Sequence, residues 1–598
     1  MMRDRTLLSC DVLNWLARLP FLAADDLALL TGSPPEDVES TLRGMGRDGQ
    51  VDWVTPSSPE LDGSRLHVLT EPARQHVARD SDWIHEGVSA LPIVKRDVLH
   101  RLTCLEATVA LNVFAADLRS ALRRSAEVDL GDFWSLPVGR PRDAWWPPGV
   151  HGFGFLQSGG SAAPFFVFID RAGAPAAHRA ALVSSWYHFR DGGQSWGRDS
   201  VPPILLLCPG SAQVGEWTNA DFASSERRGV TALHLAFADC SMPECPASAS
   251  IWRRSGGNFR TSLAQQLTWL PSAEHPAGPS TLDGQLPLAE GSAPRLHALG
   301  QAVCRRERSA SGLERIAALS LTTASTVKQL LDCLGHHPLL TEADLAVALR
   351  IPERVARRAV ERALADGLIV EVGGGGGRRR YCLTMSALRL LAARDGVPIR
   401  RYAQHAPVTA MPGEGKGHLP TLLRQREHTV GANSFFLGLL HSETPATPKL
   451  VSWLNAAESA VRFESAGVRH SLRADGSGQV LAEGHVATFL LEWDRGTERP
   501  PVLGAKLARY AAYFRSATVG GGTAPALLFV TTTPQREDLV RRLTALTLAQ
   551  FDSLVLTTCV PLLERLGPRA PIWRTSSNEP RTTWPTPSSG GTPKEVRQ

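Results

Sequence analysis

Three carboxylates in the second half of the chain have the spacing of a metal site. Asp475 lies near the end of one predicted strand, and Glu492 and Asp494 lie at the end of the next. Carboxylates on adjacent strands can hold a divalent cation, and a nearby lysine can stabilise charge that develops on a phosphate. Lys506 follows on the next predicted helix. The pattern indicates a site for Mg²⁺ or Mn²⁺ with Asp475, Glu492 and Asp494 as ligands, and the alternative is a surface ion network, such as Asp494 with Arg495.

A cluster of arginines has the arrangement of a DNA-binding surface. Four of them share one face of a predicted helix, opposite its apolar face: Arg354, Arg357, Arg358 and Arg362. Three more follow a run of glycines at the tip of a predicted hairpin: Arg378, Arg379 and Arg380. Arginine can contact phosphate and can bind guanine through two hydrogen bonds in the major groove. The pattern predicts double-stranded DNA as a partner, and the alternative is a solvated helix face.

The arginine helix belongs to a predicted order of helix, turn, helix and hairpin over residues 323–398. Thr341 suits the N-cap of the second helix, and Pro352 suits the first turn of the third. Asp366-Gly367 ends that third helix, and a strand on each side of the glycines completes the hairpin. This order is typical of a winged helix-turn-helix domain.

Residues 415–575 alternate between predicted strands and helices, which is typical of an α/β sheet that is partly parallel. The expected strands are 450–453, 469–473, 488–493 and 526–531, and the expected helices are 428–440 and 501–515. His428 and Asn433 lie on the first of these helices and are further candidate site residues. The alternative for His428 is a hydrogen bond in helix packing.

Both parts have a less polar counterpart about 320 residues earlier in the chain, which indicates an internal repeat. Phe489–Arg495 matches Phe165–Arg171, and Ile572–Arg574 matches Ile251–Arg253. The duplication predicts that Asp170 and Asp494 occupy equivalent strand ends.

The first copy is expected to lack the site. Three replacements carry this expectation: Phe168 for Glu492, Pro148 for Asp475 and Leu105 for Asn433. The counterpart of the arginine helix begins with the acidic residues Glu36 and Asp37. The expected boundaries are a degenerate winged helix at 1–80, a degenerate α/β domain at 90–255, a linker at 256–322 and a disordered tail at 576–598.

The composition is that of ordinary globular domains. Of the 598 residues, 43% are hydrophobic and 21% are charged, and the net charge is +5. No apolar run approaches ~18 residues, so no membrane partner is expected. The nine cysteines are scattered singly, which favours a reducing, cytoplasmic location. The sequence has no His-hydrophobic-His pair of a relaxase, no phosphate loop and no nucleophile elbow.

The acidic pattern resembles that of the restriction-endonuclease-like nucleases, in which an aspartate is followed by Asp/Glu-x-Lys. Asp494 stands where that lysine is expected. Some members carry Gln-x-x-x-Tyr on the next helix, and Lys506-x-x-x-Tyr510 is similar to it. The resemblance implies that Lys506 and Tyr510 form a catalytic set with Asp475, Glu492 and Asp494.

Residues from about 325 to 550 resemble the replication-relaxation family of bacterial plasmids and integrative elements. The resemblance rests on the winged-helix pattern and on three motifs: His428-x-x-x-x-Asn433, Phe489-x-x-Glu492-x-Asp494-Arg495-Gly496-Thr497-Glu498 and Lys506-Leu507-x-x-Tyr510. It implies an α/β (α+β) fold of two tandem copies of a winged helix with a restriction-endonuclease-like domain.

The implied function is that of a DNA-binding accessory protein in replication, relaxation or mobilisation, with a relaxase or replication protein as a further partner. The alternative function is a metal-dependent DNA nuclease.

Overall fold

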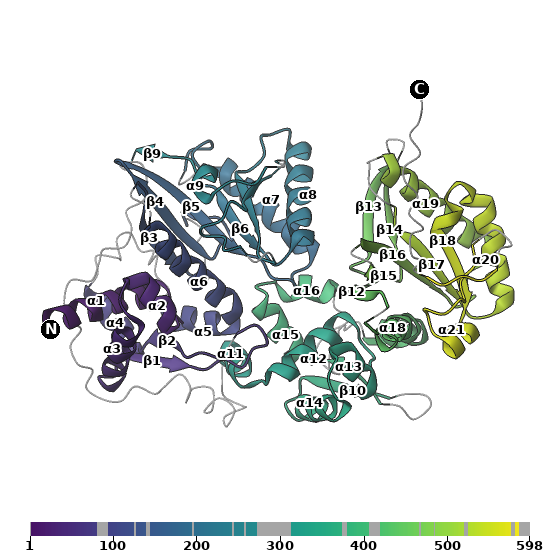
Figure 1. Cartoon of the computed structure of the whole chain (residues 1–598), viewed down its shortest axis with the longest axis horizontal. Coiled ribbons are helices and arrows are strands. Elements are labelled where there is room, and N and C mark those ends of the chain that lie inside the picture. The colour runs from purple at the N-terminus through teal and green to yellow at the C-terminus, as the bar shows by residue number, and fades with distance from the viewer. Residues whose placement is uncertain are drawn as a thin grey trace. The chain divides into compact units, whose positions relative to one another are not determined.

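The structure is a computed structural model (Figure 1). It describes residues 2–61, 63–80, 94–124, 127–138, 144–193, 196–241, 244–255, 257, 259–271, 312–373, 379–405, 419–445, 447–465, 468–482, 485–519, 524–575 and 580–584. The chain forms two compact units. Unit 1 comprises Met1–Lys328 and Arg389–Tyr402, and unit 2 comprises Gln329–Leu388 and Ala403–Gln598. Each unit contains a mixed sheet, so the mixed α/β class is confirmed.

The chain opens with the helical module of unit 1. Its elements are α1 (Met2–Arg18), α2 (Ala24–Thr31), α3 (Pro35–Arg47), β1 (Val51–Val54), β2 (Leu66–Leu69) and α4 (Glu71–Asp80). Val12, Leu27 and Leu42, from the three successive helices, are buried in one core. Their helical spacing in the sequence produces this single apolar side on each helix.

The sheet of unit 1 has the strand order β3-β4-β5-β6-β7-β8, with the short strand β9 beside β5. Helix α6 covers one face, and α7 and α8 cover the other (Figure 1). The bounds are α5 (Lys95–Thr103), α6 (Leu105–Leu122), β3 (Asp129–Ser135), β4 (Gly152–Ser158), β5 (Ser161–Ile169), α7 (Ala176–Gly192), β6 (Ile204–Cys208), α8 (Ser211–Arg228), β7 (Leu235–Asp239), β8 (Arg253–Arg254), α9 (Leu263–Gln266), β9 (Leu270–Pro271), α11 (Gly312–Thr322) and α16 (Ile399–His405).

The helical module of unit 2 repeats this order. Its elements are α12 (Ser325–His336), α13 (Glu342–Leu349), α14 (Glu353–Ala365), β10 (Ile369–Val372), β11 (Arg380–Leu383) and α15 (Met385–Arg394), of which α12 and α15 extend across the division between the units. Thr341 caps α13 by accepting a hydrogen bond from the Asp344 amide, as its residue type predicts.

The sheet of unit 2 has the strand order β12-β15-β16-β17-β18. Helix α18 packs against one face through Phe435 and Phe436, and α19 packs against the other through Leu507 and Tyr510. The bounds are α17 (Leu419–Arg424), α18 (Arg426–His441), β12 (Lys449–Asn455), β13 (Ala460–Ser465), β14 (Val468–Arg473), β15 (Gly476–Ala482), β16 (His485–Asp494), α19 (Pro500–Val519), β17 (Ala526–Thr531), α20 (Pro534–Thr547), the 3₁₀ helix η3 (Ala549–Leu554), β18 (Val555–Cys559) and α21 (Val560–Leu566).

The two sheets have matching irregularities. The pair β3–β4 is bulged between Leu130 and Asp132, and the pair β12–β15 is bulged between Leu450 and Ser452. Asp170 and Asp494 both lie at the end of the strand that starts parallel pairing, after β5 and at the last residue of β16. The expectation that these two aspartates occupy equivalent strand ends is confirmed.

Two predicted elements differ in the structure. The internal repeat predicts a continuous helix over 100–118 as the counterpart of 428–440, but this segment is broken into α5 and α6, which meet at an angle of 99°. Among the described residues, no single helix is long and apolar enough to cross a membrane, and α5 with α6 reaches that threshold only as this bent pair. The strand expected at 469–473 is β14, which pairs with β13 and stays outside the main sheet.

The expected linker and tail also contain ordered elements. Within 256–322, α9, β9 and α11 are formed, and β9 pairs with β5; residues 272–311 lie outside the described residues. Within 576–598, Thr582 bridges to Trp573, and Trp584 is buried in the core of unit 2. In these described segments a few apolar residues pack against the core. The Pro/Gly/Ser-rich composition of the stretches did not predict this order.

Strand β15 was not predicted, because its sequence begins with glycines. Packing requires glycine at two positions of this strand. A Cβ on Gly476 would lie 2.9 Å from the Phe436 ring, and one on Gly478 would lie 2.6 Å from the Phe489 ring. Gly152 and Gly154 meet the same restriction at the matching positions of β4. These glycines let aromatic rings approach the strand backbone.

Replacing Gly478 by alanine is expected to destabilise unit 2 by about 1–3 kcal/mol, because the new methyl group would overlap Phe489 and the Ser452 carbonyl. The midpoint of thermal unfolding should fall. Gly504→Ala is the matched control, because a Cβ on Gly504 meets nothing within 4 Å and alanine favours the helix α19. Equal midpoints for the two variants would contradict this account of β15.

Candidate functional site

Asp475 and Glu492 lie side by side at one end of the unit 2 sheet. Gly476 of β15 pairs with Leu491 of β16, and the Asp475 amide donates to the Leu491 carbonyl at 2.9 Å. Asp475 is therefore the residue directly beyond β15, next to Glu492. The register of two neighbouring strands brings together two carboxylates that are far apart in the sequence.

Glu492 is buried with two polar partners from helix α19. Its side chain is 1% exposed; the Tyr510 hydroxyl donates to Oε1, and the Lys506 ammonium lies 2.5 Å from Oε2. Burial and the nearby Asp475 raise the pKa of Glu492 to about 8, against the opposing effect of Lys506. This carboxyl group can therefore hold a proton close to neutral pH.

Asp475 has a different environment from Glu492. His428 Nε2 lies 3.1 Å from Asp475 Oδ2, which also accepts the Trp493 amide at 2.9 Å. Burial alone would raise the pKa of Asp475, but His428 and Lys506 hold it below its usual range. For Lys506, the opposing effect of burial is outweighed by Glu492 and Asp475, which raise its pKa. The environments push the two acid pKa values apart, which is a feature of proton-transfer sites.

Asp494 is not joined to this pair. Its carboxylate receives Arg536 Nε at 2.6 Å and the Gly496 amide at 2.8 Å. In the part of the chain that the structure describes, no group of three or more His, Cys, Asp or Glu side chains is placed to hold a metal. Of the three expected ligands, the structure brings together only Asp475 and Glu492, with Lys506, Tyr510 and His428 around them.

These groups open into a cavity of about 650 Å³ that lies within unit 2. His428, Asp475, Asp494 and Lys506 line it, together with Asn433 of α18. The candidate site is therefore accessible to a ligand, although Glu492 itself is enclosed.

Unit 1 replaces the polar set by aromatic packing. Phe168 lies at the β5 position that matches Glu492, and counting from the starts of α7 and α19 places Leu182 at Lys506 and Trp186 at Tyr510. The Phe168 and Trp186 rings are in edge contact at 5.7 Å. The expectation that Phe168 replaces Glu492 is confirmed.

The expected counterpart of Asp475 is wrong. The His151 amide donates to Val167, as Asp475 does to Leu491, and His151 Nδ1 accepts the Ile169 amide at 3.0 Å. His151, not Pro148, therefore matches Asp475. The sequence alignment failed here because β4 was not predicted.

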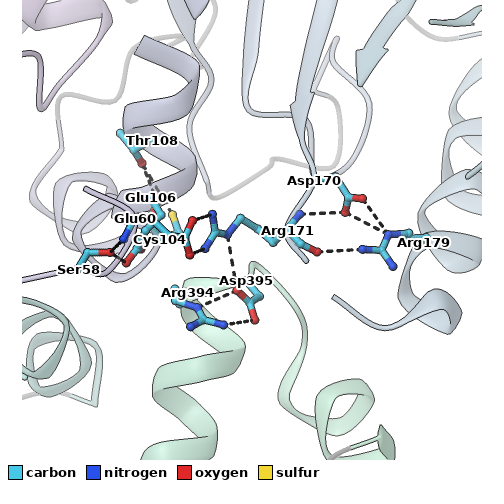
Figure 2. Close-up of polar contacts among 10 residues, drawn as sticks. All are labelled: Ser58, Glu60, Cys104, Glu106, Thr108, Asp170, Arg171, Arg179, Arg394 and Asp395. Carbon is cyan, nitrogen blue, oxygen red and sulfur yellow. Dashed lines mark hydrogen bonds and ion pairs between the residues drawn. The ribbon is translucent and has the colours of Figure 1, made fainter. Parts of the chain in front are cut away.

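A structural ion network occupies the same strand end of unit 1 (Figure 2). Arg179 binds Asp170 at 3.0 Å, and Arg171 binds Glu60 through both guanidinium nitrogens at 2.6 Å. Asp395, whose side chain is fully buried, lies 3.7 Å from Arg171. Arg171 matches Arg495 of unit 2. In unit 1 this strand end therefore has a structural role, because its arginine is held by the carboxylates of Glu60 and Asp395.

Asn433 has a packing role, and its expected counterpart is also wrong. Asn433 Nδ2 donates to the Pro338 carbonyl at 2.9 Å, and Asn112 Nδ2 donates to the Pro20 carbonyl at 2.9 Å in unit 1. Asn112, not Leu105, therefore matches Asn433. Both asparagines are the eighth residue of their helix, α6 and α18. His428 faces the candidate site, whereas Asn433 joins the helical module to the α/β part.

The four arginines of α14 lie on its solvent face: Arg354, Arg357, Arg358 and Arg362 are exposed, and Ala356, Ala359, Val360 and Ala363 are buried. Arg357 pairs with Glu342 and Glu353, and Arg362 pairs with Asp366. Arg354 and Arg358 form no ion pair with another described residue.

The hairpin arginines differ from one another. Arg379 is exposed and lies 3.7 Å from Glu371. Arg380 is partly buried and donates to the Leu339 carbonyl at 2.7 Å, so it stabilises the turn before α13. Arg378 lies outside the described residues. Only Arg379 of these three is shown on the surface.

Helix α3 of unit 1 is the counterpart of α14 and has other residues at the positions of its four arginines. Both helices follow a proline with nearly the same backbone angles, Pro34 and Pro352, and both end at an aspartate. Counting from these prolines, the four arginine positions of α14 are occupied by Glu36, Glu39, Ser40 and Gly44. Val38, Leu42 and Met45 keep three of the four buried positions apolar, and Thr41 stands for Ala359, while the solvent positions differ in charge.

Sequence patterns missed Arg536, which neutralises Asp494, and the cavity residues Arg424 and Arg473. Arg536 lies 42 residues from Asp494, and no spacing rule connects them. The proline-led start of α20 that carries Arg536 was the available signal.

Comparison with known proteins gives one result. The model of the replication-relaxation family matches residues 331–526. Searches of curated proteins and of solved structures returned no match. The matched range runs from α12 to the start of β17 and includes α14, His428, Asp475, Glu492 and Lys506. Residues 331–526 are therefore a replication-relaxation family domain, and this membership implies a plasmid-associated role in replication or relaxation.

Proposed function

We propose that the helical module of unit 2 is a winged helix-turn-helix domain that binds double-stranded DNA. The chain would then act as an accessory protein of a plasmid or integrative element in replication, relaxation or mobilisation. A relaxase or replication protein is the partner that such a role requires.

The carrying observation is the solvent face of α14. Arg354 and Arg358 are exposed without a carboxylate partner among the described residues, so contact with phosphate would break no ion pair. α14 is the third helix of the module, which is the position of a recognition helix in winged domains. A guanidinium group on such a helix can contact phosphate or the edge of guanine.

The comparison with α3 supports the proposal that the arginines of α14 serve a function and are not required by the fold. A surface helix of this fold needs no arginine there, because unit 1 has Glu36 and Ser40 at the positions of Arg354 and Arg358. The β10–β11 hairpin, with Arg379 exposed, would be the wing and would contact the backbone beside the groove.

The double variant Arg354→Ala/Arg358→Ala is expected to weaken duplex binding by about tenfold or more in fluorescence anisotropy at moderate salt. The slope of log K against log salt should fall by about 1 for each phosphate contact removed. Arg43→Ala/Arg47→Ala on α3 is the matched control and should bind as the parent does. Unchanged affinity and slope in the α14 variant would refute the proposal.

A second candidate function is metal-dependent DNA cleavage at the α/β part of unit 2, on a restriction-endonuclease-like fold. The trio of Glu492, Lys506 and Tyr510 beside Asp475 favours it, because unit 1 keeps the strands and lacks the trio. Mg²⁺ keeps several water ligands and needs one or two carboxylates from the protein. Asp475, which lines the cavity beside the enclosed Glu492, supplies one such carboxylate.

The residues have distinct tasks in this candidate. Bound Mg²⁺ or Mn²⁺ would supply Lewis-acid activation. Lys506 would face the phosphate, and Tyr510 and His428 would orient Glu492 and Asp475. Asp494, neutralised by Arg536, would position the loop after β16.

The cleavage test uses supercoiled plasmid with Mg²⁺ or Mn²⁺, and with EDTA as the metal-free control. Glu492→Gln should abolish nicking and leave the DNA affinity unchanged, because the substitution keeps the volume of the side chain and removes its ionisable carboxyl group. Plasmid that stays supercoiled with both metals, or nicking that survives Glu492→Gln, would exclude the second candidate and leave the first intact.

A further inference from the structure

The cavity of unit 2 has charged groups at its mouth and apolar groups at its base. Arg424 and Arg473 are exposed, whereas Phe436 and Phe529 are buried at 1% and 0%. A volume of about 650 Å³ is in the range of small-ligand sites. It suits a short single-stranded segment and is too small for a duplex.

Arg473, at the mouth, is available for an anionic ligand. Arg473 donates one hydrogen bond, to the Ala456 carbonyl, and forms no ion pair with another described residue. The two aspartates of the lining are less exposed and have partners within the protein: Asp494 pairs with Arg536, and Asp475 lies 3.1 Å from His428 Nε2. Glu498 also lines the cavity, so the mouth is mixed in charge with arginine on its exposed edge.

The inner wall offers apolar and amide groups to bases. Trp493 lines it and Gln425 adds an amide group, whereas the Trp453 ring is already stacked against His337 and Phe436. Arginines that follow a phosphate backbone beside an apolar, aromatic wall are the general features of single-strand binding sites.

A basic path connects this cavity to the DNA-binding hairpin. Arg426, at the start of α18, donates to the Gly373 carbonyl of the hairpin at 2.9 Å. Arg424 precedes it and lines the cavity. A strand that leaves a duplex near Arg379 would meet these two arginines before it reaches Arg473.

Unit 1 lacks the cationic groups of this path. Counting from the starts of α6 and α18, Thr103 stands for Arg424, and Leu182 stands for Lys506. Arg171, which matches Arg495, is occupied by Glu60 and Asp395 (Figure 2). Arg495 is itself paired with Glu427, so the difference between the units lies in Arg424 and Lys506, which only unit 2 carries.

We propose that the cavity of unit 2 binds a single-stranded DNA segment that continues from the duplex on α14. The preferred substrate is therefore a junction between duplex and single-stranded DNA. This inference rests on the proposed function of the helical module, and it names the DNA structure that the domain recognises.

The test compares a blunt duplex, the same duplex with a single-stranded thymidine tail on either end, and the tail alone, by fluorescence anisotropy with the full chain. One tailed duplex should bind about tenfold or more tightly than the blunt duplex. Arg473→Glu should remove this gain and leave blunt-duplex affinity unchanged. Arg509→Ala, an exposed arginine on α19 outside the cavity lining, is the matched control and should keep the gain.

The outcomes separate the two proposals. Blunt-duplex binding with no gain from either tail overturns the cavity assignment and leaves the winged-helix proposal standing. A gain that Arg473→Glu retains also overturns it. No binding to any duplex refutes the winged-helix proposal. In that case, a tail that binds alone supports single-strand binding by the cavity, and a tail that does not bind overturns the cavity assignment as well. Displacement of the tail by a free thymidine nucleotide at similar concentration would show a mononucleotide site and contradict the inference.

Discussion

One buried amide fixes the helical module of unit 2 against its sheet. Asn433 donates to the carbonyl of Pro338, which precedes Leu339, a non-glycine residue with φ of 68°. The same helix carries His428 to the candidate site. Asn112 repeats the contact in unit 1, where Phe21 also has φ of 68°. Because a buried carbonyl without a partner is costly, the position of the arginine helix relative to the cavity depends on this hydrogen bond.

Local patterns were sufficient for the helical modules. Helical periodicity, the Thr341 cap and the Pro352 start placed α13 and α14 correctly, and the same periodicity identified the solvent face of the arginines. These elements are specified by residues within a few positions of one another. Strand β16 was also recognised, because its apolar run ends in Glu492 and Asp494.

The site itself required tertiary information. Strand β15 is hidden by Gly476 and Gly478, which are selected by the rings of Phe436 and Phe489 and not by a turn. The partners of the acidic residues come from elements distant in sequence, as with Asp494 and Arg536. Spacing shows that carboxylates are near one another, but it does not show which cation each of them faces.

The segment Arg389–Tyr402 belongs to unit 1, although the chain on both sides of it belongs to unit 2. Asp395 is its anchor, with no exposed side-chain surface, beside Arg171 and above Gly173. Unit 1 therefore cannot be completed during synthesis until residue 402 has left the ribosome, after the whole helical module of unit 2 has been made. The two units are thus joined in the timing of their folding, and no single cut in the chain divides the protein into two complete halves.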